Sequence, residues 1–131
     1  MTTPILSRIM MVEDEADIQV VARLALEALG GFTVEVCSSG DEALRKAPVF
    51  APDLILLDVM MPGMDGPATL LSLRAMEAMS NTPIVFMTAK AQPREVAEYK
   101  RLGALDIIPK PFDPMALATT ITTIWNGYHG G

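Results

Sequence analysis

Five polar residues stand out because each ends or closely follows a short apolar run of the sequence; they are Glu13, Asp14, Asp58, Thr88 and Lys110. If those runs are neighbouring strands of a parallel sheet, their carboxyl ends meet at one edge, where open α/β sheets bind ligands. The sequence therefore predicts one site that contains three carboxylates, a hydroxyl group and an ammonium group.

These groups are suited to phosphoryl transfer. Carboxylates crowded at a dry rim repel one another unless a hard cation that prefers oxygen binds among them, and Mg²⁺ meets that need. Asp58 follows a continuous apolar run, so rigid backbone would hold it as a nucleophile. Its attack on a phosphoryl group would give an acyl phosphate, with Lys110 and the metal balancing charge and Thr88 donating a hydrogen bond.

The elements that must position this site can be located from apolar periodicity. Short apolar runs lie at residues 9–12, 34–36, 54–57, 84–87 and 107–108. Segments of helical period follow them, at about residues 15–29, 39–46, 67–79, 93–102 and 114–126. Five strand–helix units with short loops predict an α/β fold, a (βα)5 unit with a doubly wound, five-stranded parallel sheet.

The first two helices carry explicit signals. Ser39 and Glu42 have the spacing of a capping box, and Pro48 predicts that the helix they begin ends near Lys46. The first helix should end at a glycine of the pair 30–31. Its buried apolar stripe should consist of Ile18, Val21, Ala22, Ala25 and Leu29.

Length and composition limit the class of protein. The 131 residues are half hydrophobic, which predicts a single globular domain over residues 1–131, with a core at about 8–126 and no output domain. The net charge of −6 and the absence of a basic cluster argue against direct nucleic-acid binding. No apolar run is long enough for membrane insertion, and Cys37 has no partner for a disulfide, so a cytoplasmic location is expected.

From about residue 9 to residue 125 the chain resembles bacterial two-component response regulator receiver domains, stand-alone chemotaxis-type regulators included. The resemblance rests on five motifs: an acidic pair after the first predicted strand, a ten-residue block at the end of the third predicted strand, a Thr-Ala pair, a Gly-Ala pair, and a Lys-Pro-Phe motif near the end of the sequence. These motifs are Glu13-Asp14, Leu57-Asp58-Val59-Met60-Met61-Pro62-Gly63-Met64-Asp65-Gly66, Thr88-Ala89, Gly103-Ala104 and Lys110-Pro111-Phe112.

The resemblance implies a flavodoxin-like sheet of strand order 2-1-3-4-5 and a phosphoacceptor role for Asp58. It implies Mg²⁺ held by Glu13, Asp14, Asp58 and the backbone carbonyl of Met60, with Lys110 on the phosphoryl group and a cis peptide bond before the following proline. The implied donor is a sensor histidine kinase or a histidine phosphotransfer protein. The product would be a signalling switch or relay with an unknown protein target, not a turnover enzyme.

Three positions depart from the usual pattern of the family. Ile107 stands where most members carry a tyrosine or phenylalanine that turns inward, and a β-branched aliphatic side chain has a stiff χ1 and no ring to move. We therefore expect Thr88 to move while the surface of the fourth helix, fifth strand and fifth helix changes less. The resemblance implies that Met60 and Lys90 flank the path of the attacking water, and neither side chain is a carboxylate or amide that could orient it. We therefore expect slow self-dephosphorylation; loss of the phosphoryl group within seconds in magnesium buffer would contradict this.

Other interpretations start from the same residues. Taken alone, Glu13 and Asp14 could be solvated acids at a helix start, Thr88 a structural hydroxyl and Lys110 a surface group. A flavin-binding electron carrier shares the fold, but Glu13 and Asp14 would repel the flavin phosphate. A phosphohydrolase would need a carboxylate where Met60 stands. A receiver that only binds a partner, with vestigial phosphate chemistry, is the remaining alternative.

Overall fold

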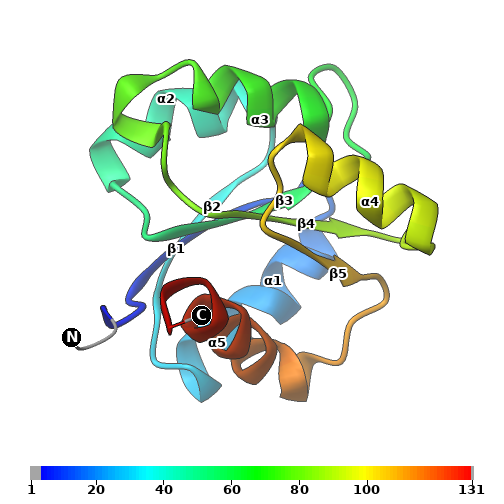
Figure 1. The fold of residues 1–131 in the computed structure, drawn as a ribbon. Helices are drawn as coiled ribbons and strands as arrows, with labels where there is room; N and C mark the ends of the chain where they lie inside the picture. Colours follow the sequence, from blue (N-terminus) through cyan, green and yellow to red (C-terminus); the bar gives the residue numbers. More distant parts are fainter. Residues whose placement is uncertain (1–3, 131) are drawn as a thin grey trace.

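The computed structural model describes residues 4–130 and contains one five-stranded parallel sheet in the order β2-β1-β3-β4-β5 (Figure 1). This confirms the predicted fold class and strand order. The strands are β1 (Arg8–Val12), β2 (Thr33–Cys37), β3 (Leu54–Asp58), β4 (Ile84–Thr88) and β5 (Asp106–Pro109). The central strands β3 and β4 are buried along their whole length, as their continuous apolar sequences predicted.

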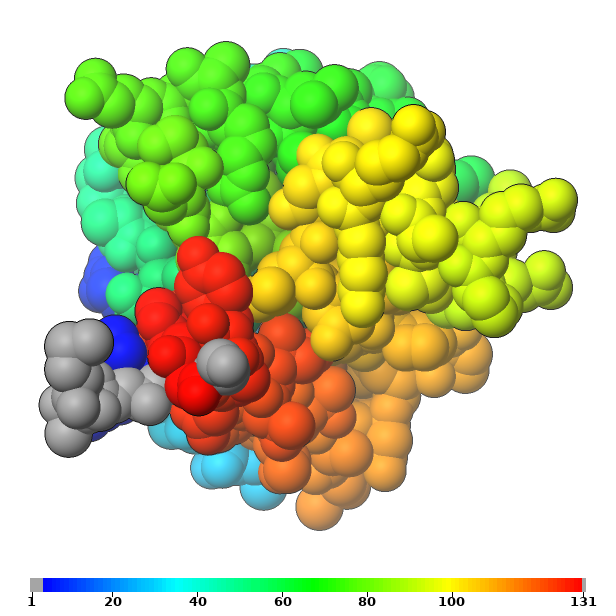
Figure 2. Space-filling model, in the orientation of Figure 1, coloured from blue at the N-terminus to red at the C-terminus, as the bar shows by residue number. Residues whose placement is uncertain are grey.

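Helices cover both faces of the sheet. In Figure 1, α2, α3 and α4 lie above the sheet, while α1 and α5 lie below it. Figure 2 shows the same face of the molecule with all atoms drawn. The helices are α1 (Ala16–Leu24) with a π-helical continuation η1 (Ala25–Leu29), α2 (Gly40–Phe50), α3 (Gly66–Arg74), a 3₁₀ turn η2 (Glu77–Met79), α4 (Pro93–Leu102) and α5 (Pro114–Gly130).

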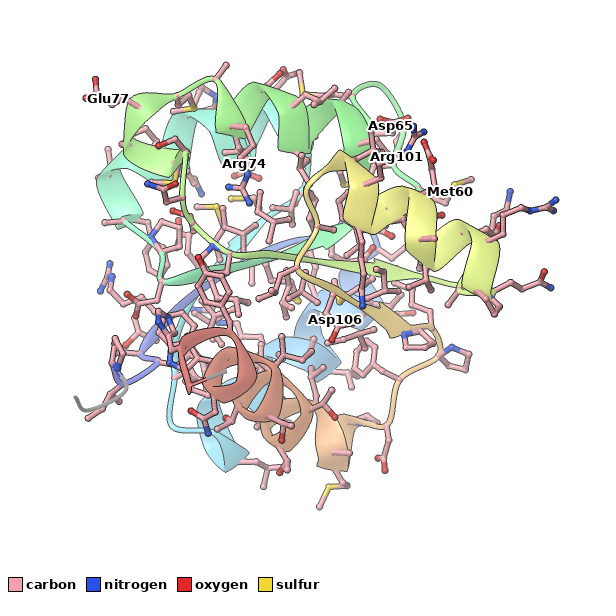
Figure 3. The ribbon with its side chains drawn as sticks, viewed as in Figure 1. Met60, Asp65, Arg74, Glu77, Arg101 and Asp106 are labelled. Atoms are coloured by element: carbon pink, nitrogen blue, oxygen red, sulfur yellow. The ribbon has the colours of Figure 1, made fainter. Side chains whose placement is uncertain are left out.

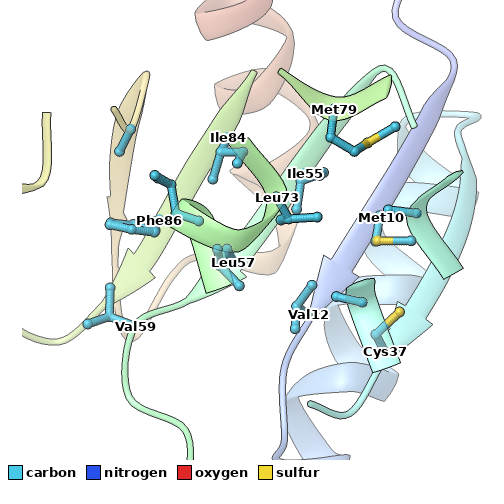
Figure 4. Packing of buried hydrophobic residues seen from close by; sticks show 14 of the residues in the cluster. Met10, Val12, Cys37, Ile55, Leu57, Val59, Leu73, Met79, Ile84 and Phe86 are labelled. Atoms are coloured by element: carbon cyan, nitrogen blue, oxygen red, sulfur yellow. The ribbon is translucent and has the colours of Figure 1, made fainter. Parts of the chain in front are cut away.

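Alternation along the strands gives the sheet two separate apolar cores. The core under α2, α3 and α4 includes Val12, Leu57 and Phe86 (Figure 4). The opposite core, toward α1 and α5, includes Met11 and Leu56, the neighbours of those residues along the same strands. The two cores hold the strands firmly, so that the residues at the strand ends lie on rigid backbone.

The prediction that the second helix ends near Lys46 is wrong. Helix α2 continues through Pro48 to Phe50 and ends at Ala51, which has a left-handed φ of 55°. Proline within a helix removes one hydrogen bond. Here the helix end is held in another way, because the guanidinium of Arg8 donates two hydrogen bonds, of 2.9 and 2.7 Å, to the Phe50 carbonyl. Tertiary contacts therefore outweigh the local effect of the proline.

The apolar stripe expected on the first helix is only partly correct. Ala22 and Ala25 are buried, but Val21 is 43% exposed and Leu29 is 54% exposed, and Leu26 is buried in their place. The helix becomes π-helical from Ala25, which adds residues to each turn and rotates the following side chains away from a 3.6-residue period. The third predicted helix is also divided, into α3 and η2, and the fifth runs past residue 126 to Gly130.

Candidate functional site

The five polar residues predicted for the site all lie at the carboxyl edge of the sheet. Asp58 and Thr88 are the last residues of β3 and β4, Glu13 and Asp14 follow β1, and Lys110 follows β5. One carboxylate oxygen from each of the three acids lies within 4.8 Å of the others. The structure therefore brings the three predicted carboxylates together, although they are up to 45 positions apart in the chain.

Lys110 neutralises part of this acidic cluster. Its ammonium nitrogen lies 2.6 Å from Glu13 Oε1 and 3.1 Å from Asp58 Oδ1. The peptide bond between Lys110 and Pro111 is cis, as the family resemblance implied. Burial alone would lower the pKa of Lys110, but the hydrogen bonds to Glu13 and Asp58 outweigh it and raise the pKa above its usual value. The side chain is therefore a fixed positive charge beside Asp58.

The environment of Asp58 opposes its ionisation. Burial of the carboxyl group, together with the hydrogen bond to Lys110, which lowers the pKa, and the charge of Glu13, which raises it, gives Asp58 a raised pKa of about 6. Glu13 is itself fully buried, and its second carboxylate oxygen accepts a hydrogen bond of 3.1 Å from the Glu15 amide. One ammonium group thus pairs with two buried carboxylates.

A third carboxylate leaves an oxygen without any partner. Among residues 4–130, Asp14 Oδ1 is the one buried side-chain oxygen or nitrogen without a hydrogen bond. Buried polar atoms are normally paired, so an unpartnered carboxylate oxygen beside two other carboxylates indicates room for a cation. The donor set is made only of oxygen, which suits a hard divalent ion and not a soft one. Glu13, Asp14 and Asp58 can therefore hold a metal ion.

Thr88 and the residues at the rim of the site lie in different environments. The buried Thr88 hydroxyl oxygen accepts a hydrogen bond of 3.0 Å from the Lys90 amide, and the Lys90 side chain is exposed. Met60 is 61% exposed, and its amide lies 3.4 Å from Asp58 Oδ1. Met60 and Asp65 both lie on the loop after β3 (Figure 3). The Asp65 carboxylate caps α3 by accepting a hydrogen bond of 2.9 Å from the Ala68 amide.

Ile107 lies in the core and not in the site. It is 9% exposed and pairs with Phe86 across the β4–β5 register, on the face covered by α4. The Phe86 ring also meets the ring of Tyr99 from α4 edge-on, with 5.3 Å between ring centroids. The position that carries a mobile ring in most receivers is thus filled by a packed aliphatic side chain, so the expected smaller change of the α4, β5 and α5 surface stays a prediction.

Sequence reasoning missed the role of Gly66 in the site. A Cβ atom at this position would lie 2.6 Å from the Asp58 carbonyl oxygen and 2.7 Å from the Cα of Val59. Glycine therefore lets the start of α3 approach the end of β3, and the Gly66 amide donates a hydrogen bond of 2.9 Å to the Val59 carbonyl. The signal for this close backbone contact in the sequence is the glycine itself.

An apolar groove next to the site was also missed. It runs between α1 and the start of α5 and has a volume of about 350 Å³. Val20 is 67% exposed there, Leu24 65% and Met115 73%, and Val21 and Pro114 line both this groove and a second cavity that reaches Lys110. Exposed apolar patches of this kind mark interaction surfaces. Val20 and Leu24 lie outside the apolar stripe predicted for the first helix, so that stripe gave no sign of this surface.

Comparisons with known proteins identify the family. A family model for the response regulator receiver domain matches residues 9–122. The chain is 38% identical over 117 residues to the alkaline phosphatase synthesis transcriptional regulatory protein PhoP of Bacillus subtilis (strain 168), covering 89% of this chain and 48% of PhoP. It is 37% identical to the regulatory protein AtoC of Escherichia coli (strain K12), covering 82% of this chain and 23% of AtoC.

A solved structure agrees with these matches. Chemotaxis response regulator CheY4 of Vibrio cholerae superposes with a TM-score of 0.84 at 31% sequence identity, covering 92% of this chain and 99% of CheY4. The fold and site together define a doubly wound α/β domain with an acidic cluster at the carboxyl edge of its sheet. The chain belongs to the response regulator receiver domain family and is a receiver domain of two-component signal transduction.

Two further observations concern the length of the chain and its helices. The chain spans about half the length of PhoP and about a quarter of AtoC. Within residues 4–130, none of the helices combines the length and the apolar character needed to cross a membrane.

Proposed function

We propose that this receiver domain accepts a phosphoryl group on Asp58 and acts as a signalling switch or relay, not as a turnover enzyme. The observation that carries the proposal is the convergence of Asp58 with Lys110, Glu13 and the unpartnered oxygen of Asp14 at one edge of the sheet. Asp58 would attack phosphorus through a carboxylate oxygen, and Lys110 is placed to bind an equatorial phosphoryl oxygen.

Each of the other groups has a part in this proposal. Glu13, Asp14 and Asp58 would hold Mg²⁺, with the Met60 backbone carbonyl as a further ligand, and the bound ion would neutralise charge on the transferred group. The Thr88 hydroxyl oxygen accepts a hydrogen bond from the Lys90 amide, so the hydroxyl proton remains available to donate to a phosphoryl oxygen. Met60 and Lys90 offer no carboxylate to activate water, which supports a long-lived phosphoryl group.

The test of the main proposal is incubation with acetyl phosphate and Mg²⁺, followed by intact mass spectrometry. We expect the wild-type chain to gain one phosphoryl group and Asp58→Asn to gain none. Asp65→Asn is the matched control, because Asp65 lies on the same loop but outside the carboxylate cluster, and asparagine can still cap α3. An adduct of equal yield on Asp58→Asn would refute the proposal.

Metal binding gives a separate prediction. Asp14→Asn should weaken Mg²⁺ binding at least about tenfold, since changes even to groups outside the ligand set cost that much at metal sites. Isothermal titration calorimetry of the unphosphorylated chain would measure the affinity. Asp41→Asn, an exposed acid in the first turn of α2, should bind Mg²⁺ as the wild type does. Equal affinities for all three chains would place the metal elsewhere.

We further propose that the donor is a histidine kinase or a histidine phosphotransfer protein that docks on the groove between α1 and α5. The groove lies beside the site, because Val21 and Pro114 line both the groove and the cavity next to Lys110. Its exposed apolar side chains suit the apolar stripe of a donor helix, which would carry the phosphohistidine to the carboxyl edge of the sheet.

Leu24→Gln tests this docking surface. We expect transfer from a phosphohistidine protein to fall roughly tenfold, as for the loss of one buried leucine contact. Phosphorylation by acetyl phosphate should keep its rate, because a small donor needs no docking surface. Leu71→Gln on α3 is the control, since Leu71 is 57% exposed on the opposite face of the sheet. If the two variants slowed transfer equally, the groove would not be the docking site.

A further inference from the structure

A second apolar cavity lies directly beside the phosphoacceptor site. It has a volume of about 420 Å³, within the range of small-molecule pockets. Its apolar walls come from the start of α1, from the residue after β4 and from the turn between β5 and α5. These walls are Ile18, Val21, Ala89, Pro111, Phe112 and Pro114.

Lys110 connects this cavity to the acidic cluster. The same side chain that lines the cavity places its ammonium nitrogen 3.1 Å from Asp58 Oδ1. Asp17 is the other charged residue in the lining, and it lies on the exposed first turn of α1. A donor whose phosphoryl group sits between Asp58 and Lys110 therefore has an apolar cavity next to its reacting centre.

We propose that this cavity binds the leaving group of small acyl phosphate donors and favours acyl chains longer than acetyl. This inference rests on the proposed phosphorylation of Asp58. In the reaction an Asp58 carboxylate oxygen forms the new bond to phosphorus while the bond from phosphorus to the bridging acyl oxygen breaks. The departing carboxylate takes the bonding electron pair and needs no proton, and its alkyl chain lies against Val21 and Phe112.

The size of the preference follows from apolar burial. Butyryl phosphate has two more methylene groups than acetyl phosphate. The conjugate acids of the two leaving carboxylates are almost equally strong, so the two donors have similar intrinsic reactivities. Two methylenes in a cavity that is partly open should favour butyryl phosphate about three- to tenfold. The alkyl chain contacts the cavity wall both in the bound donor and in the transition state. The preference for butyryl phosphate should therefore appear as half-saturation at a lower donor concentration and not as a higher maximal rate.

The experiment compares acetyl, propionyl and butyryl phosphate as donors to the full chain with Mg²⁺, with the Asp58 adduct followed by intact mass. In the wild type the second-order rate constant should rise along the series. Val21→Ser, which removes apolar wall at a half-exposed position, should reduce the butyryl-to-acetyl ratio to about one to two. Val21→Ile should keep the wild-type ratio. Val49→Ser is the control, because Val49 is an 87% exposed valine on α2.

Different results would overturn different claims. Equal rate constants for the three donors on the wild-type chain, with Asp58 phosphorylated, would overturn the assignment of the cavity and leave the proposed function intact. A rising series that Val21→Ser and Val49→Ser change equally would also overturn it. No adduct from any donor would overturn both the cavity assignment and the phosphoacceptor proposal. The wild-type series alone is decisive if a variant fails to fold.

Discussion

Replacing Lys110 with alanine is expected to slow phosphorylation of Asp58 by acetyl phosphate by about 100-fold or more. The ammonium group lies 3.1 Å from Asp58 Oδ1. Asp58 is buried, and electrostatic interactions between charged groups are stronger there than in water. Removal of one such fixed stabiliser of developing charge costs about 10²–10³ in rate at other active sites. Intact mass spectrometry over a time course would measure the rate.

The control for this variant is Lys100→Ala, because Lys100 is a half-exposed lysine on α4 whose contact with Asp106 is a longer 3.8 Å. It should phosphorylate within about twofold of the wild type, as expected for an exposed ion pair of small energy. Circular dichroism would confirm that both variants fold. A Lys110→Ala rate within about threefold of the wild type would contradict a direct role for the ammonium group and would reduce it to a partner of Glu13.

Much of the site followed from the sequence because parallel strands impose a simple geometry. Residues that end consecutive strands meet at one edge, so Glu13, Asp58 and Thr88 could be placed together without any knowledge of their contacts. The fold class followed from the same apolar runs. The family resemblance supplied the strand order and the cis peptide bond at Lys110, both of which the structure contains.

Other features depend on packing between distant segments and could not be predicted. The helix becomes π-helical from Ala25, so that Leu26 is buried and Leu29 is 54% exposed, which a 3.6-residue pattern does not anticipate. The end of α2 depends on the contact between Arg8 and Phe50, 42 positions apart. The raised pKa of Asp58 depends on its burial next to Glu13, which no local sequence signal reports. Sequence patterns predict elements and strand ends well, but not helix rotation or local electrostatics.

The electrostatic state of Asp58 leads to the second large prediction, which concerns stability without metal. In the folded chain the pKa of Asp58 is about 6, against an ordinary value of 3.8. Between these two values the folded chain binds more protons at this group than the unfolded chain does. The free energy of unfolding therefore falls as pH rises through that window, and the ionised carboxylate destabilises the fold at neutral pH.

Asp58→Asn should remove this destabilisation, because the amide has the shape of the carboxyl group and carries no charge. In buffer with a chelator at pH 7.5, we expect its free energy of unfolding to exceed that of the wild type by about 1–3 kcal/mol, and the difference to shrink toward zero below about pH 4. Urea unfolding followed by Trp125 fluorescence at several pH values would measure both. Asp65→Asn should differ little from the wild type, since asparagine caps a helix as aspartate does. A lower stability of Asp58→Asn at pH 7.5 would mean that the pair with Lys110 outweighs burial, and that the pKa of Asp58 lies below its ordinary value.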